Sequence, residues 1–291
     1  MRKILLLDPS RIHAMNLMQR RSAAAIAEAI VAAKGAPKGA VPRASGGVMI
    51  IPLHGYIVHR GDDLSMFLGE TPIVAWMNRV EQAINDDDVG GIVLDIDSPG
   101  GEVDGVPEAA ARLYALRGKK PIVAVANTLA ASAAYWIGTA ADKLFVTPSG
   151  EVGSVGVVAV HVDESRRLEE AGFTVTIFRA GRFKGELSPF EPLTEEARQY
   201  ETGVISEIYA DFVAAVARHR GTSPANVRAN YGEGRLVPAV SAVKEGMADG
   251  VRTMQDVVSS MAGTVSAGKR RAEARKIWAA AAARKKFARR P

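Results

Sequence analysis

Ser132 is the residue whose surroundings best suit a nucleophile. It stands in the small-residue run Leu129-Ala-Ala-Ser-Ala-Ala-Tyr-Trp136, at the expected start of a helix. Small neighbours let a substrate backbone approach, and a helix N-terminus offers N–H donors to a developing oxyanion. The plainer interpretation is an N-cap serine on a buried, Ala-rich helix, and this segment taken alone favours it.

Lys184 is the candidate general base. It lies in Arg179-Ala-Gly-Arg-Phe-Lys-Gly-Glu-Leu-Ser-Pro189, after an expected strand and among glycines and an aromatic residue. Burial disfavours an ammonium group, so a desolvated lysine can accept a proton. Loop lysines are mostly exposed, and the segment alone favours that interpretation.

A third segment, Leu94-Asp-Ile-Asp-Ser-Pro-Gly-Gly101, predicts a strand that enters a tight Pro-Gly-Gly turn before a helix. Glycine has no Cβ, so its backbone N–H can approach a ligand closely. A purely structural turn is the alternative. No Gly-Lys-Ser/Thr follows, so the segment is not a phosphate-binding loop.

Four motifs together resemble the signal peptide peptidase A family. They are Ser98-Pro-Gly-Gly101, Ala130-Ala-Ser-Ala-Ala-Tyr135, Val152-Gly-Ser-Val-Gly156 and Ala180-Gly-Arg-Phe-Lys184, in the order of that family. The likeness covers about residues 48–255. Each motif is weak alone, but four in order are specific. The resemblance implies a serine peptidase with a Ser–Lys dyad and a fold similar to crotonase and Clp protease.

The resemblance also implies the role of each site residue. Ser132 is the expected nucleophile, Lys184 the general base, and Ser154 the residue that helps to hold the lysine. The backbone N–H groups of Gly101 and Ala133 match the oxyanion hole. The family usually has glycine after the nucleophile, but alanine keeps the N–H, so only the width of the pocket changes. No metal or organic cofactor is needed.

A histidine base is the alternative to the lysine. His161 lies 29 residues after Ser132, with Asp163 nearby, which loosely resembles the Ser–His–Asp order of Clp protease. No Clp-like sequence surrounds His161, and the lysine motif is already complete. The sequence therefore favours Lys184.

Two further pairs of polar residues lie near the first strands. His54 and His59 are expected in a loop after the first strand, where histidines are usually solvated. Asp95 and Asp97 are two residues apart on a strand, so they share a face and are candidates for a carboxylate pair. Polarising or capping the end of the sheet is the simpler role for them.

The elements expected to position these residues alternate between strands and helices. Expected strands are 48–52, 91–96, 122–126, 143–146, 155–160 and 174–178; expected helices are 72–85, 106–117, 132–140, 164–171 and 194–220, the last with Thr194 as N-cap. Such alternation predicts an α/β fold with a mostly parallel sheet covered by helices.

Composition and charge divide the 291 residues further. Residues 1–45 hold eight Lys/Arg and two Asp/Glu, residues 46–265 hold 19 and 29, and residues 266–291 hold ten and one. We expect a helical extension (1–34), a Gly/Pro linker (35–47), a peptidase domain (48–258) and a basic, Ala-rich, helical tail (259–291). There is no cysteine, and the apolar run Ile4 to Leu7 is too short for a secretory or spanning segment, which predicts a cytoplasmic protein without a membrane anchor.

The stretch Ser188-Pro-Phe-Glu-Pro-Leu-Thr-Glu-Glu-Ala-Arg198 is similar to the phage capsid-protease branch of the family, the minor capsid protein C type. That branch implies cleavage of scaffold and capsid proteins, and of the chain itself, during head assembly in the host cytoplasm. The family also implies a homo-oligomer, in which one subunit can contribute to its neighbour's site. The basic tail is a candidate for capsid docking or for nucleic-acid binding.

Three other functions stay open at this point. One is a soluble peptidase, similar to signal peptide peptidase, that degrades peptides. A crotonase-like acyl-CoA enzyme shares the fold and the oxyanion hole but would not need Ser132 or Lys184. A non-catalytic capsid or scaffold component would need neither residue for assembly.

Overall fold

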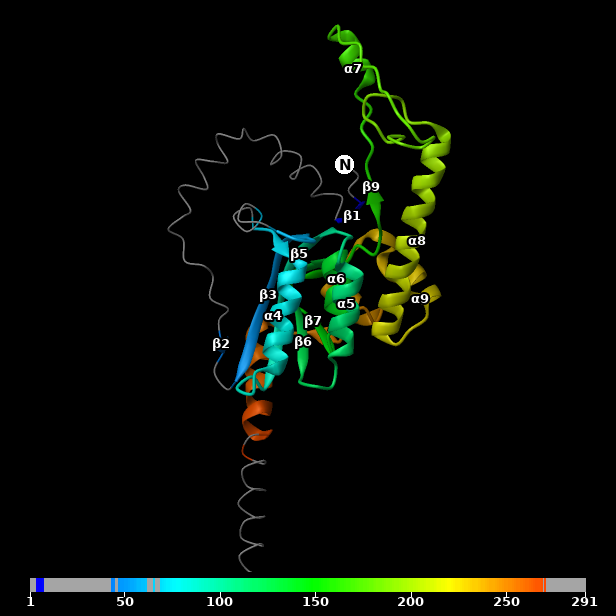
Figure 1. Cartoon of the computed structure of the whole chain (residues 1–291). Helices are drawn as coiled ribbons and strands as arrows, with labels where there is room; N and C mark the ends of the chain where they lie inside the picture. The colour runs from blue at the N-terminus through cyan, green and yellow to red at the C-terminus, as the bar shows by residue number, and fades with distance from the viewer. Residues whose placement is uncertain are drawn as a thin grey trace, which may run out of the picture.

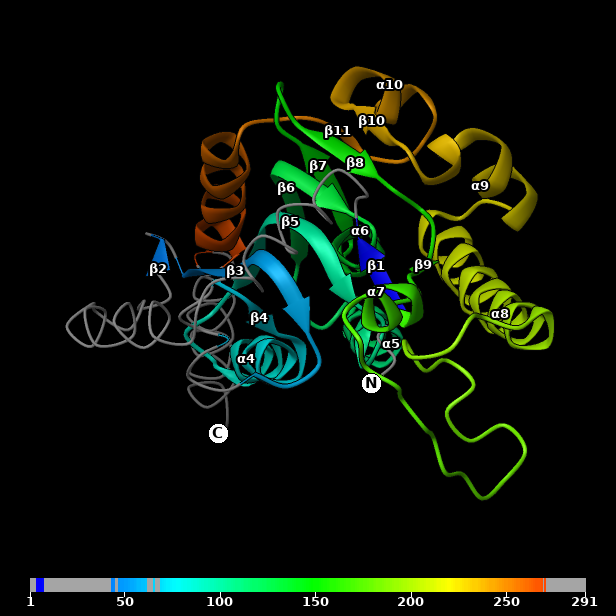
Figure 2. The same ribbon diagram turned by 90° about the horizontal axis from the view of Figure 1, so that it is seen from above.

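The described residues of the chain form an 11-stranded sheet. Helices cover both faces of this sheet, as Figures 1 and 2 show. The computed structural model describes residues 4–7, 43–44, 47–61, 65, 69–268 and 270. The extension, the linker and the tail therefore lie largely outside the described residues. The α/β class with a mostly parallel sheet is confirmed.

Parallel strands form the centre of the sheet. In spatial order they are β4 (Thr71–Pro72), β3 (Val48–Val58), β5 (Gly91–Glu102), β6 (Ile122–Ala131), β7 (Lys143–Val146) and β11 (Gly250–Val251). Ile92, Val93 and Leu94 of β5 are all fully buried. Continuous apolar runs of this kind are typical of strands covered on both faces, which accounts for the parallel centre.

The carboxyl end of this sheet carries shorter strands. They are β1 (Ile4–Leu7), β8 (Glu151–Gly153), β9 (Val158–Ala159) and β10 (Leu236–Pro238). Strand β2 (Arg43–Ala44) instead pairs antiparallel with the start of β3, at the amino end of the sheet. Strand β8 pairs in parallel with the end of β6, and β10 pairs antiparallel with β8. Strand β1 lies antiparallel between the end of β5 and β9. Three of the four motifs, those that contain Gly101, Ser132 and Ser154, meet at this end.

Helices cover one face of the sheet and form the main core. They are α4 (Ile73–Asn85), α5 (Val106–Ala115), α6 (Ala133–Thr139) and α8 (Glu195–Arg220), with α9 (Pro224–Asn230), the 3-10 helix η1 (Gly232–Gly234) and α10 (Ala239–Lys244) beyond them. Trp136 of α6 stacks on Phe212 of α8 with ring centroids 4.6 Å apart. The Thr194 hydroxyl accepts from the Ala197 N–H at 3.2 Å, so the predicted N-cap of α8 is confirmed.

The opposite face carries a helix over residues 254–268 (Figure 2). Its Val257, Met261 and Val265 lie one turn apart and pack with Val93 and Val125 of the sheet. Each such buried side chain stabilises the fold by about 1.5–3 kcal/mol. The expected boundary after residue 258 falls inside this helix.

Two predicted strands differ in the structure. Residues 174–178 form no strand, although their β-branched sequence favours one, because the described part of the chain offers them no pairing partner. The expected strand over 155–160 is reduced to β9. Residues 174–178 and β9 belong to the arm, residues 157–194 with the short helix α7 (Ser165–Glu170), which extends beyond the sheet in Figure 1.

The Pro-Gly-Gly segment also differs from its prediction. Strand β5 does not turn at Gly100 but continues to Glu102. Pairing explains the extension, because β3 accompanies Gly100 and Gly101 on one side and β1 accompanies them on the other. In the expected N-terminal helical extension, residues Ile4–Leu7 form this strand instead, and residues 8–34 lie outside the described part of the chain.

His219 is buried in the core at 5% exposure. Its Nδ1 lies 3.0 Å from the Thr139 hydroxyl, which itself donates to the Trp136 carbonyl, so the imidazole must be the donor to Thr139. Its Nε2 has no partner among the described residues. Burial, with Arg218 and Arg117 nearby, lowers the pKa of His219 from 6.5 to about 3.

We expect this imidazole to make the fold sensitive to mild acid. Below pH 6.5 the His219 imidazole binds a proton in the unfolded chain but stays neutral in the folded chain. The free energy of unfolding therefore decreases as the pH falls from 6.5 towards 3. At pH 5 the loss is about 2 kcal/mol. Urea unfolding at pH 7 and pH 5 should show it, and His219→Asn, which can still donate to Thr139, should have a shallower pH dependence. Equal pH dependence in the two proteins would contradict this assignment.

None of the helices in the described ranges has both the length and the apolar character that crossing a membrane requires.

Candidate active site

Ser132 lies where β6 ends and α6 begins, and the backbone there is unusual. Its φ is 53° and ψ is −118°, in a region that non-glycine residues seldom adopt. The Ser132 N–H donates to the Gly153 carbonyl at 2.7 Å, which fixes the junction between β6 and β8. Strained backbone of this kind persists where surrounding contacts hold it, and it gathers at active sites.

The Ser132 side chain is fully buried, and its Oγ has no hydrogen-bond partner among the described residues. Buried hydroxyl groups are nearly always bonded, so an unsatisfied one requires a reason. A nucleophile that awaits its base and substrate supplies such a reason. Ala133 begins α6, and an N–H in the first turn of a helix has no intrahelical acceptor. It can therefore serve an oxyanion.

The end of β5 brings Gly101 close to the neighbouring backbone. A Cβ at Gly101 would lie 1.9 Å from the Ile57 carbonyl oxygen, so only glycine fits there. Ser98 fixes this strand end: its buried hydroxyl donates to the Gly55 carbonyl at 2.6 Å and accepts from the Gly100 N–H at 3.2 Å. Ser98 therefore positions the Gly100–Gly101 backbone, a role that was not predicted, although its place directly before Pro-Gly-Gly is the sequence signal for it.

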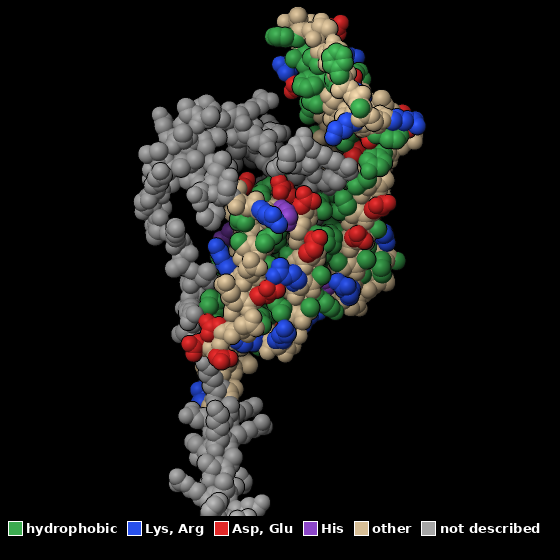
Figure 3. Space-filling model, in the orientation of Figure 1, with side chains coloured by type: hydrophobic (Ala, Val, Ile, Leu, Met, Phe, Trp, Pro, Cys, Tyr) green, Lys and Arg blue, Asp and Glu red, His purple; other side chains and the backbone are tan. Residues whose placement is uncertain are grey.

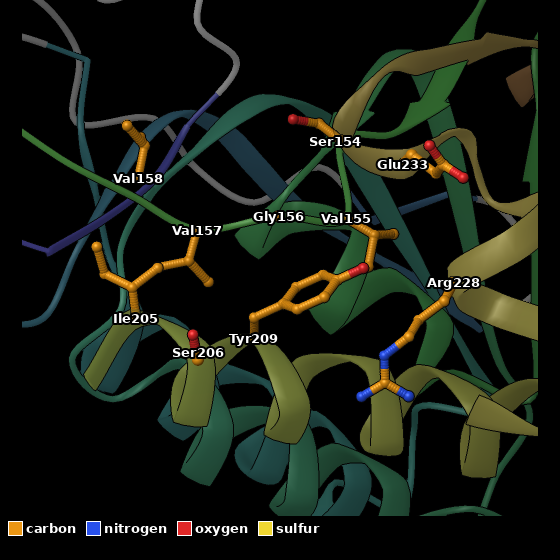
Figure 4. Close-up of a pocket in the computed structure, with 11 residues that line it drawn as sticks. Ser154, Val155, Gly156, Val157, Val158, Ile205, Ser206, Tyr209, Arg228 and Glu233 are labelled. Atoms are coloured by element: carbon orange, nitrogen blue, oxygen red, sulfur yellow. The ribbon is translucent and has the colours of Figure 1, made fainter. Parts of the chain in front are cut away.

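Ser154 is buried beside the same junction. Its φ is 52°, and its N–H donates to the Arg235 carbonyl at 2.8 Å. It also lines a groove of about 660 Å³ between residues 154–158 and helix α8. Figure 4 shows Val157, Ile205 and Tyr209 at this groove. The groove has both apolar and polar lining, including Arg228 and Glu233. It starts next to Gly153, whose carbonyl accepts from the Ser132 N–H.

Lys184 lies on the arm and is exposed. It lines a second cavity of about 1240 Å³ between the arm and the start of α8, and Ser132 is not among the residues that line it. The structure thus gathers Ser132, Ala133, Gly101 and Ser154 at the carboxyl end of the sheet. Within the described part of one chain, Lys184 is not buried among apolar side chains.

The histidine alternative receives no support from the geometry. His161 Nε2 lies 3.2 Å from the Ser188 carbonyl oxygen on the arm. The Asp163 carboxylate accepts from the side chain and backbone of Ser165, at 2.6 and 2.9 Å, and these bonds lower the Asp163 pKa. No hydrogen bond joins His161 to Asp163 in the described ranges.

His54 and Asp95 contact each other through a hydrogen bond between their side chains. His54 lies within β3, not in a loop, and its Nε2 is 3.1 Å from Asp95 Oδ2. The bond to Asp95 raises the His54 pKa. Burial raises the Asp95 pKa, but hydrogen bonds from His54 and Asn127 outweigh it, and the net effect lowers that pKa. Both oxygens of the Asp95 carboxylate therefore have hydrogen-bond partners, His54 and Asn127.

Comparison with known proteins identifies relatives in phages and in bacteria. The chain is 33% identical over 222 residues to Head-tail preconnector protein GP5 of Enterobacteria phage P21, covering 76% of this chain and 44% of that protein. It is 29% identical over 225 residues to Capsid assembly protease C of Escherichia phage lambda, covering 77% and 51%. Protease 4 of Salmonella typhi is 28% identical over 186 residues, covering 64% and 30%.

The chain thus spans about half the length of the phage relatives that it matches. The model of peptidase family S49 matches residues 115–268, which include Ser132, Ser154 and Lys184. This match extends over more than half of the 291 residues and over the strand, helix and arm described above. The chain belongs to peptidase family S49.

Proposed function

We propose that the chain is a serine endopeptidase in which Ser132 is the nucleophile and Lys184 the general base. The observation that carries the proposal is the buried, unpartnered Ser132 hydroxyl, held on strained backbone in a chain of peptidase family S49. Gly101 and Ala133 supply the oxyanion N–H groups, and Ser154 helps to hold the lysine.

The proposed steps follow from these roles. The neutral Lys184 amine takes the proton of Ser132 while Oγ attacks a peptide carbonyl. The two backbone N–H groups stabilise the tetrahedral oxyanion, and the ammonium then gives its proton to the leaving amine. Lys184 then takes a proton from a water molecule that attacks the acyl carbonyl, and it returns this proton to Ser132 Oγ as the bond between Oγ and the acyl carbon breaks. No metal or organic cofactor takes part.

Lys184 must be brought to Ser132 and shielded from water for this chemistry. Eight large apolar side chains of residues 160–200 are exposed, and Figure 3 shows hydrophobic side chains on the projecting arm. An exposed apolar surface of this kind indicates a contact with another molecule. We therefore propose a homo-oligomer in which the arm packs on a second copy of the chain.

We propose scaffold and capsid proteins of an assembling phage head, and the chain itself, as substrates. Two relatives named for head and capsid assembly support this choice. Residues 46–265 have an excess of acidic residues, whereas residues 1–45 and 266–291 are basic. This distribution fits a protein whose ends dock on an assembly and are later removed by cleavage.

Incubation with a purified prohead scaffold protein tests the function. We expect defined scaffold fragments, and mass spectrometry should find that the chain trims itself near residues 34–47 or in the basic tail. The Ser132→Ala protein should give neither product. If both proteins leave scaffold and chain intact, or both give the same fragments, the proposal is wrong.

A further inference from the structure

The apolar segment Ile4–Leu7 occupies the end of β5 that adjoins the nucleophile. Strands β5 and β6 run in parallel until Ser98 pairs with Ala130, and β6 then pairs with β8 instead. The edge of Gly100–Glu102 that β6 leaves is filled by β1, with Leu7 opposite Gly100, Leu6 opposite Gly101 and Leu5 opposite Glu102. This includes the glycine that we place in the oxyanion hole.

The C-terminal end of β1 and Ser132 lie at the same position along the strand direction of the sheet. Ser98 and Ala130 are partners; two residues further on, Gly100 lies in β5 and Ser132 directly follows the end of β6. Leu7, the partner of Gly100, is therefore the β1 residue at the level of Ser132. Since β1 is antiparallel to β5, its chain runs from Ile4 towards this level.

Strand β1 thus approaches Ser132 in the same chain direction as the N-terminal part of a substrate, which becomes the acyl group when the bond is cleaved. A bond placed at Ser132 would have Ile4–Leu7 on its N-terminal side, where the acyl-enzyme forms. Strand β9 closes the other edge of β1, with Ile4 opposite Ala159 and Leu5 opposite Val158, and Val158 also lines the groove beside Ser154. Figures 1 and 2 both show β1 beside β9. An extended peptide between two strand edges is a recurring mode of peptide recognition.

We propose that Ile4–Leu7 occupies, as a β-strand, the acyl-side site of the peptidase and competes there with substrate. This inference rests on the proposed function and adds to it an internal competitor and a substrate class: extended segments with apolar residues on the acyl side. Tethering gives a segment an effective concentration in the millimolar range, so even weak binding restrains the site.

A proline at Leu6 tests the strand pairing in the full-length chain. Proline removes the backbone N–H and disfavours pairing on both edges. With fluorescein-labelled casein as substrate, we expect Leu6→Pro to lower KM about fivefold or more at unchanged kcat. Leu6→Val keeps the N–H and a β-favouring side chain and should behave as the unmodified protein does. Equal KM values in all three folded proteins would overturn the proposal.

A direct binding measurement separates this inference from the proposed function. A fluorescein-labelled peptide with the sequence of residues 2–8 is titrated with Ser132→Ala proteins that carry or lack Leu6→Pro. We expect at least about fivefold tighter binding to the Leu6→Pro protein, and none of a scrambled peptide. Equal binding to both overturns the inference. If the peptide binds as expected while the active chain cleaves no casein or scaffold, the proposed function fails instead.

A reversible lock covers the case in which Leu6→Pro does not fold. The chain contains no cysteine, so Ile4→Cys with Ala159→Cys places the only thiols on paired residues of β1 and β9. Oxidation should lower casein cleavage about tenfold or more, and dithiothreitol should restore it. Each single-cysteine variant should be insensitive to both treatments. Full activity of the cross-linked protein would overturn the proposal.

Discussion

Replacing Ser132 with alanine is expected to lower kcat/KM for peptide cleavage by about 10⁴-fold or more, because no other group can form the acyl-enzyme. The same change should not weaken the fold. The Ser132 Oγ is buried without a partner among the described residues, so its removal relieves an unsatisfied polar group. We expect a free energy of unfolding that is equal or up to about 1 kcal/mol higher. Activity and urea unfolding are measured on the same preparation.

Two comparisons make the Ser132 result specific. Ser260→Ala alters an exposed serine on the helix of the opposite face and should retain full activity. A fluorophosphonate probe should label the unmodified chain at Ser132, as read by peptide mass spectrometry, and should not label Ser132→Ala. A Ser132→Ala protein that still cleaves peptides, or labelling at a different serine, would exclude Ser132 as the nucleophile.

The sequence predicted the central sheet and the helices that cover it, because their signals are local. Apolar runs such as Gly91–Ile96 and amphipathic patterns such as Pro72–Asn85 report burial directly. The position of Ser132 at a strand-to-helix junction was also predictable, since a serine among alanines favours a helix start. These features depend on neighbours along the chain, and the structure confirms them.

Pairing between distant segments was not predictable from the same signals. Ser98 positions the Gly100 backbone through Gly55, which lies 43 residues earlier. Strand β1 pairs with β5, nearly one hundred residues later in the chain, and its four apolar residues do not indicate which strand they pair with. Residues 174–178 show the converse: their composition favours a strand, but a strand requires a neighbouring edge. Propensity cannot supply the partner.

The arm has the properties of a segment that needs a second chain. Its surroundings expose a set of large apolar side chains, namely Val160, Val162, Phe173, Val175, Phe178, Phe183, Phe190 and Tyr200. Residues 174–178 would gain a pairing partner, and these side chains would leave water, if the arm packed on a neighbouring subunit. The same contact would shield the Lys184 amine, which is exposed in the single chain. We therefore expect Lys184 to act on Ser132 of an adjacent subunit.

Lys184→Met should lower kcat/KM by about 10³–10⁴-fold, because methionine keeps an unbranched side chain, one atom shorter, but cannot accept the proton of Ser132. Lys184→Arg should be equally inactive, since a guanidinium stays protonated. Lys244→Met, at the end of α10, serves as the matched control and should remain active. Full activity of Lys184→Met would show that the base is another group.

Mixing the two inactive proteins tests whether the dyad is completed between subunits. When Ser132→Ala and Lys184→Met chains are co-expressed and assemble at random, a site needs an intact Ser132 from one chain and an intact Lys184 from its neighbour. About one quarter of the sites then contain both, so about a quarter of the unmodified activity should return. A dyad formed within one chain predicts no recovery, because every chain lacks one of the two residues. Recovery near a quarter, measured on assemblies purified through a tag on each chain, would therefore place the two residues of each site on different subunits.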